Sequence, residues 1–203
     1  SEDWLYKMFG IDAELLIDHA WGYETCRMSD IKNYHSEEHS LSNGQVLMRN
    51  YSFEEALVIV REMTDNLVLD LFEKGLVTSS LTLWIAYDHR YEHEASKGTV
   101  KLERESNSSK KIIDAVEDLY LRIADRYTGI RRIEVCANRV APESYVQYSL
   151  FDDPKQTDKE RHLQEAVLNV KQRYGKNAIM RGSNLLECST YRERNEQIGG
   201  HRA

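Results

Sequence analysis

Two pairs of histidines have a spacing that could hold a metal ion. His35 and His39 stand four residues apart, as do His89 and His93, and on a helix this spacing places two imidazoles on one face, where they could ligate zinc. Both pairs lie in polar segments without the apolar period of a helix. We therefore interpret these histidines as solvated loop residues, with metal binding as the less favoured alternative.

A polymerase or nuclease site would need carboxylates at the ends of strands, because such carboxylates hold the two magnesium ions of the reaction. The adjacent acids Glu2 and Asp3 lie at the terminus, and Asp152 and Asp153 lie in a loop, where solvated charge is the favoured interpretation. The sequence also shows no glycine-rich phosphate loop and no nucleophile with a supporting histidine. No catalytic residue is predicted, and the chain alone is not expected to be an enzyme.

The peptide Gln147–Phe151, with the sequence QYSLF, lies between two prolines in a stretch without a regular period. Such a peptide is expected to be exposed and extended. Its glutamine amide can hydrogen-bond to a partner's backbone, while Leu150 and Phe151 can fill an apolar pocket. It is therefore a candidate partner-binding motif. The alternative is that Leu150 and Phe151 anchor the loop on the protein's own core.

Five basic residues on predicted strands are candidates for contacts with phosphates, because cationic side chains on a sheet can donate to phosphate oxygens whatever the base sequence. Arg131 and Arg132 lead the group, and Arg49, Lys101 and Arg104 follow. A basic residue on a strand is more often part of a solvated face. Successive residues such as Arg131 and Arg132 also point to opposite faces, so that only one is expected to meet DNA from the sheet.

The composition indicates an ordinary globular protein with one or two modest domains. The chain has 203 residues, of which 41% are hydrophobic and 30% are charged. No apolar run approaches the roughly 18–20 residues of a membrane helix, and the first residues do not resemble a secretory signal, so a cytoplasmic location is expected. Cys26, Cys136 and Cys188 are odd in number and far apart, which favours reduced thiols.

The net charge of −7 is unevenly distributed. Of the 34 acidic residues, 15 lie in residues 1–76 against 6 of the 27 basic residues, which leaves 19 acidic and 21 basic residues in 77–203. The basic surplus is concentrated in three windows with a net charge of +3 each: Lys97–Lys111, Arg122–Arg139 and Lys155–Lys176. The downstream part of the chain is therefore compatible with a nucleic-acid partner despite the negative total.

Hydrophobic periodicity divides the chain into four segments. Residues 1–28 predict two short helices, with Asp12 as an N-cap and Gly22 as a C-cap, and residues 29–41 predict a linker. Residues 42–141 form the predicted central domain, and residues 142–203 hold the candidate motif, a helix over Lys159–Tyr174 and an irregular tail.

The central domain predicts the order β-α-β-β-α-β. Ser52 and Glu55 form a capping box before the first helix, and the second helix starts near Ser109. Trp84 is interpreted as a packing residue rather than a base-stacking platform. The predicted fold class is α+β, with a four-stranded antiparallel sheet, two helices on one face and the other face available for a ligand. The predicted strands are Gln45–Tyr51, Val77–Tyr87, Thr99–Glu105 and Ile130–Val140.

Together these segments resemble the C-terminal part of a bacterial Y-family, or translesion, DNA polymerase. Leu5–Gly22 is similar to the end of the family's thumb domain, although Trp21 departs from the commoner residue. Ser40–Leu47 is similar to the family's entry into its DNA-binding little finger, and Ile130–Val135 is similar to the last strand of that domain. Gln147–Phe151 closely resembles the pentapeptide that binds the bacterial sliding clamp.

The resemblance implies a role and its partners. The role is translesion synthesis in DNA repair and the SOS response, and the partners are primer–template DNA and the sliding clamp. The end of the tail, around Tyr174–Arg181 and Arg192–His201, is similar to the subgroup of the polymerase V catalytic subunit. Besides the basic residues above, the implied DNA contacts are Ser42, Asn43 and Gly44. The implied clamp contacts are Gln147, Ser149, Leu150 and Phe151.

The resemblance also implies that the metal-binding acids of the family's palm domain lie upstream of this chain, so Mg²⁺ belongs to the palm and no cofactor is expected here. Two other functions stay open. The sheet could be a ferredoxin-like platform for protein partners without nucleic acid. It could also be a small-molecule or enzymatic domain, which would need a concave pocket with converging polar groups.

Overall fold

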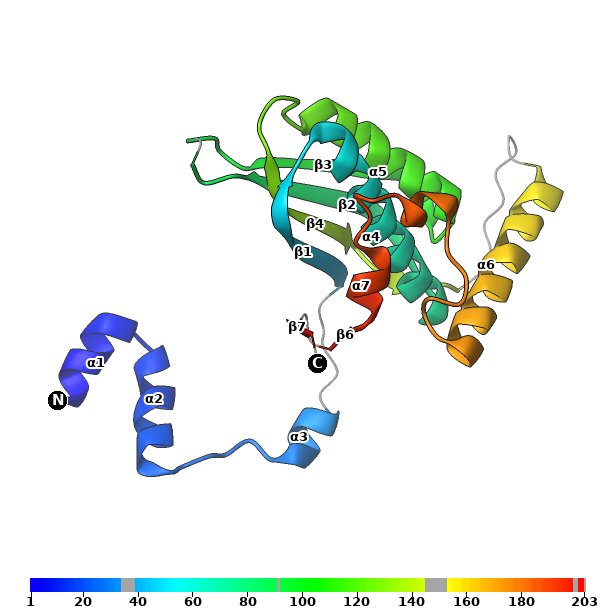
Figure 1. Cartoon of the computed structure of the whole chain (residues 1–203). Coiled ribbons are helices and arrows are strands. Elements are labelled where there is room, and N and C mark those ends of the chain that lie inside the picture. Colours follow the sequence, from blue (N-terminus) through cyan, green and yellow to red (C-terminus); the bar gives the residue numbers. More distant parts are fainter. Residues whose placement is uncertain (34–38, 91, 145–152, 199–200, 203) are drawn as a thin grey trace. The chain divides into compact units, whose positions relative to one another are not determined.

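The structure, a computed structural model, divides the chain into two compact units, Ser1–Glu38 and His39–Ala203 (Figure 1). It describes residues 1–33, 39–90, 92–144, 153–198 and 201–202. The candidate motif Gln147–Phe151 and His35 lie outside the described residues.

Over residues 1–33 the first unit forms three helices, which are α1 Glu2–Phe9, α2 Asp12–Trp21 and α3 Met28–Asn33. α1 packs against α2. Gly22 ends α2 with a left-handed φ of 79°, as predicted for a C-cap. Asp12, predicted as the N-cap, is instead the first helical residue, and Ile11 precedes it. α3 lies largely in the segment predicted as a linker. Ala13 is the one buried residue of the three helices.

The second unit is built on an antiparallel sheet with the strand order β1-β4-β2-β3. A short strand, β5, pairs with the start of β2. β1 and β3 begin earlier than the predicted Gln45 and Thr99. The predicted fold class, with its β-α-β-β-α-β order, is confirmed. The strands are β1 Ser40–Tyr51, β2 Leu76–Tyr87, β3 Ser96–Ser106, β4 Ile130–Asn138 and β5 Ala141–Pro142.

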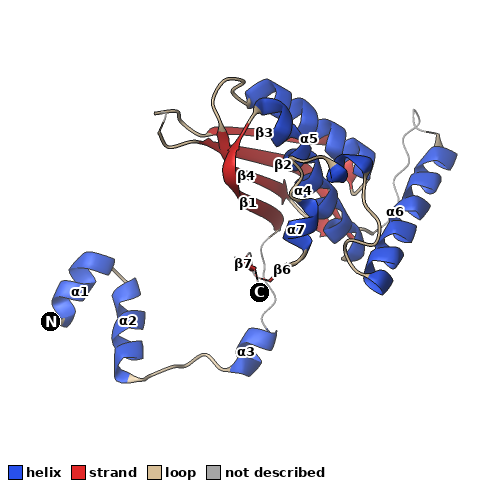
Figure 2. Cartoon of the chain, in the orientation of Figure 1, coloured by secondary structure: helices blue, strands red, loops and turns tan. Residues whose placement is uncertain are grey.

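Two helices, α4 Phe53–Glu73 and α5 Ser109–Ile123, cover one face of the sheet (Figure 2). α4 begins at the predicted capping box. The Glu55 backbone N–H donates to Ser52 Oγ at 3.2 Å, and the Ser52 N–H donates to the Glu55 carboxylate at 3.0 Å. We call the sheet face beneath these helices the covered face and the opposite one the open face.

The helices and the covered face enclose the main core, because side chains alternate along the strands. Leu81, Leu83 and Ile85 of β2 are fully buried there. The approach of α5 to β3 is close: a Cβ at Gly98 would stand 2.8 Å from Leu119 Cδ1, so only glycine fits without a shift.

The C-terminal segment returns to the helical layer. α6 begins earlier than the predicted Lys159, because Asp153 caps it by accepting from the Lys155 N–H at 3.0 Å. α6 and η1 both contact α4. Gln45 of β1 donates to Thr190 Oγ1 at 3.0 Å. The elements are α6 Pro154–Tyr174, η1 Gly182–Leu185, α7 Tyr191–Asn195, β6 Gln197–Ile198 and β7 His201–Arg202.

Candidate nucleic-acid interface

The open face carries a row of polar residues across three strands. Thr82 of β2 lies between Cys136 of β4 and Thr99 of β3 in the strand register, and the two threonine hydroxyls are 2.8 Å apart. Asn138 donates to Thr82 Oγ1 at 2.9 Å. Burial, and to a smaller extent the Glu134 carboxylate, raise the pKa of the Cys136 thiol, which therefore stays protonated at neutral pH.

These residues line a shallow depression with a volume of about 470 Å³. Hydroxyl, amide and cationic groups converge on it, which suits a ligand rich in acceptor oxygens. Trp84 is partly buried in the lining of this depression rather than in the core. The depression is lined by Thr82, Trp84, Lys97, Thr99, Arg132, Glu134, Cys136 and Asn138.

Arg132 reaches the depression from β4. Its Nη2 lies 3.6 Å from Glu134 Oε2, and its guanidinium lies 5.1 Å from the centre of the Trp84 ring. The side chain of Arg132 is 51% exposed. Because the contact with Glu134 is long and half-exposed, it contributes little stability. The structure thus places Arg132 where a phosphate could reach it.

Strict alternation along β4 would place Arg131 on the covered face, because its neighbour Arg132 lies on the open face. The structure shows a different arrangement. The register of β2 and β4 shifts between Ala86, opposite Arg132, and Tyr87, opposite Ile130, so that β4 has one extra residue. Ile130 and Ile133 are both fully buried. The bulge between them lets both arginines stay outside the core. Arg132 lines the depression and Arg131 does not, and the expectation that only one of them meets DNA stays a prediction.

Lys97 and Lys101 extend the open face along β3. Lys97 is opposite Trp84 and Lys101 is opposite Ser80, and both lysines are exposed. Arg104 is exposed in the irregular stretch where the pairing of β2 and β3 shifts. Lys101 therefore lies beside the depression, whereas Arg104 lies beyond its regular part.

Arg49 has a structural partner. Its guanidinium makes two hydrogen bonds to the Glu55 carboxylate, at 2.6 and 2.9 Å, and lies 4.2 Å from the centre of the Tyr51 ring. This pairing, with the hydrogen bond from Ser52, lowers the pKa of Glu55. Arg49 therefore supports the capping box of α4 and is placed apart from the depression.

The three β1 residues assigned by resemblance point in different directions. Ser42 is exposed and is opposite Cys136, so it faces the open side. Asn43 faces the helices, where it donates to the Met63 carbonyl at 3.4 Å and accepts from Arg194. Only its backbone could take part in a contact on the open face. Gly44 is opposite Glu134 in the register.

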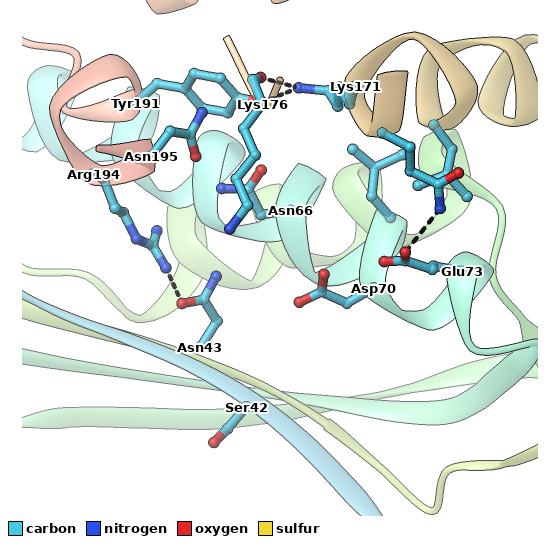
Figure 3. A pocket seen from close by; sticks show the side chains of 13 residues that line it. Ser42, Asn43, Asn66, Asp70, Glu73, Lys171, Lys176, Tyr191, Arg194 and Asn195 are labelled. Carbon is cyan, nitrogen blue, oxygen red and sulfur yellow. Dashed lines mark hydrogen bonds between the residues drawn. The ribbon is translucent and has the colours of Figure 1, made fainter. Parts of the chain in front are cut away.

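A second, polar cavity of about 350 Å³ lies where the C-terminal segment meets α4 (Figure 3). Arg194 donates to Asn43 and Lys171 donates to the Tyr191 hydroxyl. Burial lowers the pKa of Arg194, although that guanidinium keeps its charge. These contacts join the tail to β1 and α6. We therefore interpret the cavity as a packing interface between elements of the fold rather than as a ligand site.

Other site types find little support in the parts of the chain that the structure describes. No group of three or more His, Cys, Asp or Glu residues is placed to hold a metal ion there. Of the predicted histidine pairs, His93 lies against Asp125, with a ring nitrogen 3.5 Å from the carboxylate. In the same residues, none of the helices is long and apolar enough to cross a membrane.

Of the eight residues that line the depression, sequence reasoning assigned only Arg132 to a site. Lys97 lies before the predicted start of the third strand. Thr99, Glu134 and Asn138 were on predicted strands but carried no cationic signal of their own. Thr82 and Trp84 share one face of β2, and the pairing of β2 with β3 and β4 brings the other residues beside them. That pairing could not be predicted from one sequence.

The central domain of this chain matches a known family. The family described as the impB/mucB/samB family C-terminal domain matches residues 38–150. The chain therefore belongs to this family, and its identification as the C-terminal domain of a Y-family DNA polymerase is confirmed.

Two curated relatives are both named DNA polymerase IV 2. The protein from Bacillus subtilis (strain 168) is 25% identical over 203 residues, which cover 98% of this chain and 47% of the relative. The protein from Halalkalibacterium halodurans is 21% identical over 168 residues, which cover 82% of this chain and 40% of the relative. The chain thus spans about half the length of the curated relatives it matches.

Two solved structures are similar in part. One is a complex of the beta-clamp processivity factor with the little finger domain of PolIV, with a TM-score of 0.40 and 12% identity, covering 56% of this chain and all of that one. The other is a Y-family DNA polymerase chimera with a TM-score of 0.40 and 16% identity, covering 70% of this chain and 39% of the chimera.

Proposed function

We propose that this region grips primer–template DNA through the open face and recruits a sliding clamp through Gln147–Phe151, so that a catalytic region of the same polymerase is held on damaged templates. One observation carries the DNA-binding part. Lys97, Lys101 and Arg132 gather with hydroxyl and amide groups on a sheet face that neither α4 nor α5 covers.

The chemistry of the open face favours phosphates over bases. Its hydroxyls, ammonium groups and guanidinium groups are donors that fit phosphate oxygens, and phosphate contacts carry no sequence information. Such a grip suits translesion synthesis, because it does not depend on the shape of the damaged base pair. A net charge of −7 keeps the expected affinity low, so a clamp tether would supply the local concentration.

The finer assignment to the polymerase V subgroup is also a proposal. It is supported by the resemblance of Tyr174–Arg181 and Arg192–His201, whereas both curated relatives carry the name polymerase IV. In this proposal Mg²⁺ is held by the palm domain of the longer protein. The sequence encoded upstream of Ser1 tests the placement of Mg²⁺: acids on a strand there would support a palm domain, and an unrelated domain would contradict it.

DNA binding is tested by replacing Arg131 and Arg132 together with alanine. We expect weaker binding to every primer–template sequence, and a salt slope that is smaller by about 0.9 for each phosphate that the variant no longer neutralises. Fluorescence anisotropy of labelled duplexes between about 50 and 200 mM salt measures both quantities.

The matched control is Lys110→Ala/Arg122→Ala, which removes two positive charges from α5, on the other side of the sheet. If the arginine variant bound DNA as tightly as this control, the open face would not be the binding surface.

A protein-interaction module is the second candidate, because an apolar groove lies between α5 and α6. It has a volume of about 670 Å³. Leu163 on its wall is 63% exposed. The same binding experiment separates the two candidates, since a module without a nucleic-acid role would not bind DNA at low salt. The apolar lining comes from Leu69, Ile113, Leu163, Val167, Ile179 and Met180.

A further inference from the structure

Glu134 is an acid at the centre of the open face. It is opposite Gly44 on one side and opposite Trp84 on the other, within the depression that carries the cationic groups. Its side chain is 39% exposed. A carboxylate in a surface that binds phosphates is unfavourable for affinity, because like charges repel.

The side chain of Glu134 lies close to both Arg132 and the backbone of β1. One of its carboxylate oxygens lies 3.6 Å from Arg132 Nη2. Its Cγ would lie 3.7 Å from a Cβ built at Gly44, so the side chain lies against the β1 backbone there. A carboxylate and a phosphate present similar acceptor oxygens to a guanidinium, so both would compete for the donors of Arg132.

We propose that Glu134 is an internal competitor of the DNA phosphate, a residue that sets the affinity of the open face by holding Arg132 until DNA displaces it. The proposal rests on the proposed function, because it needs DNA on this face. Its physical consequence is that binding exchanges one partner of Arg132 for another, which lowers the net gain and allows the sheet to release and rebind the duplex.

The test is Glu134→Gln in the 203-residue chain, with Glu103→Gln as the matched control. Glu103 is also an exposed acid on the sheet, on β3, but it does not line the depression. At about 50 mM salt we expect Glu134→Gln to bind a labelled primer–template three to five times more tightly, about the strength of a half-exposed ion pair. The control should change the affinity less.

The variant Arg132→Ala shows whether Glu134 acts through Arg132. In that background we expect Glu134→Gln to have only the small effect of Glu103→Gln, because the contested guanidinium is gone. A full effect that persisted without Arg132 would mean that Glu134 acts only by its overall charge, and it would overturn the proposal.

A weaker affinity of Glu134→Gln would also overturn it, since Glu134 would then be positioning Arg132 for DNA. The thermal midpoint of each variant shows that the comparison concerns folded protein. If Arg131→Ala/Arg132→Ala weakened binding while Glu134→Gln left it unchanged, only this inference would fail. If neither the natural chain nor any variant bound DNA, the proposed function would fail with it.

Discussion

The helical layer and the open face of the sheet use their charged residues differently. On the covered side, arginines form close pairs with carboxylates and connect separate elements: Arg161 donates to Glu143 at 2.7 and 2.8 Å, and Arg181 donates to Asp65 at 2.6 Å. On the open face, the side chains of Lys97 and Lys101 make no hydrogen bond or ion pair with any other described residue, and Arg132 has one long ion pair, with Glu134, besides its contact with the Trp84 ring.

This difference separates cations that stabilise the fold from cations that are exposed on the surface. The bidentate pair of Arg161 and the pair of Arg181 tie α6 and the tail to the body of the domain. The cations of the open face form no such close pairs with the described residues. They can therefore be removed with little effect on folding, whereas the same change on the covered side would loosen the tail.

The largest single effect is expected for the candidate clamp-binding peptide Gln147–Phe151. Leu150→Ala/Phe151→Ala is expected to abolish binding of a bacterial sliding clamp, because each apolar side chain contributes about 1.5–3 kcal/mol when it is enclosed. Calorimetry with the clamp measures this change in affinity.

The thermal midpoint of the same variant distinguishes the alternative. A peptide that binds a partner does not stabilise the core, so the midpoint should not change. A lower midpoint, together with no clamp binding by the natural chain, would mean that Leu150 and Phe151 anchor the loop on this protein instead.

Neighbouring residues of β2 sharpen the comparison of the faces. Leu83 is fully buried on the covered face, and Leu83→Ala should lower the free energy of unfolding by about 2–5 kcal/mol. Thr82 lies beside it on the open face, and Thr82→Ala should cost less than about 1 kcal/mol. Urea unfolding measures both. Equal losses would show that the open face is as important to folding as the core.

The periodic parts of the fold were predictable from sequence, because apolar spacing alone distinguishes helices from strands. The capping box at Ser52 and the buried alternation of Leu81, Leu83 and Ile85 are examples. Such patterns depend on residues close in sequence. They predicted the sheet and its two helices, and also that one face would stay open.

The missed features depend on partners far apart in the sequence. The bulge at Arg131 follows from the pairing of β4 with β2, and no local pattern marks it. Asn43 was assigned to DNA, but its side chain faces Arg194, 151 positions away. Lys97 was missed because β3 starts at Ser96, whereas the alternation of apolar and polar residues that predicted this strand becomes recognisable only from Thr99. The site residues were therefore less predictable than the elements that carry them.

The smallest expected effect concerns a buried acid on the covered side. Glu62 of α4 is 3% exposed, and its Oε2 accepts from the Thr190 N–H at 3.3 Å while Oε1 has no partner among the described residues. Burial raises the pKa of Glu62, and the charge of Arg194 opposes this shift only in part. The raised pKa means that the protonated form is favoured by folding.

Glu62→Gln should therefore be more stable than the natural chain at neutral pH, by about 1 kcal/mol or less. With a folded pKa above the ordinary value of about 4.3, the natural chain loses stability as the pH rises through the folded pKa, and glutamine does not. Glu55→Gln is the control of opposite sign, since the pKa of Glu55 is lowered and its contribution is lost as the pH falls. As the pH rises from 4 to 8, the thermal midpoint of Glu62→Gln should rise relative to that of the natural chain. The thermal midpoint of Glu55→Gln should fall relative to it. If the difference in thermal midpoint between Glu62→Gln and the natural chain stayed constant over this range, the pKa of Glu62 would not be raised. The buried carboxylate would then be fully stabilised by its neighbours as an ion.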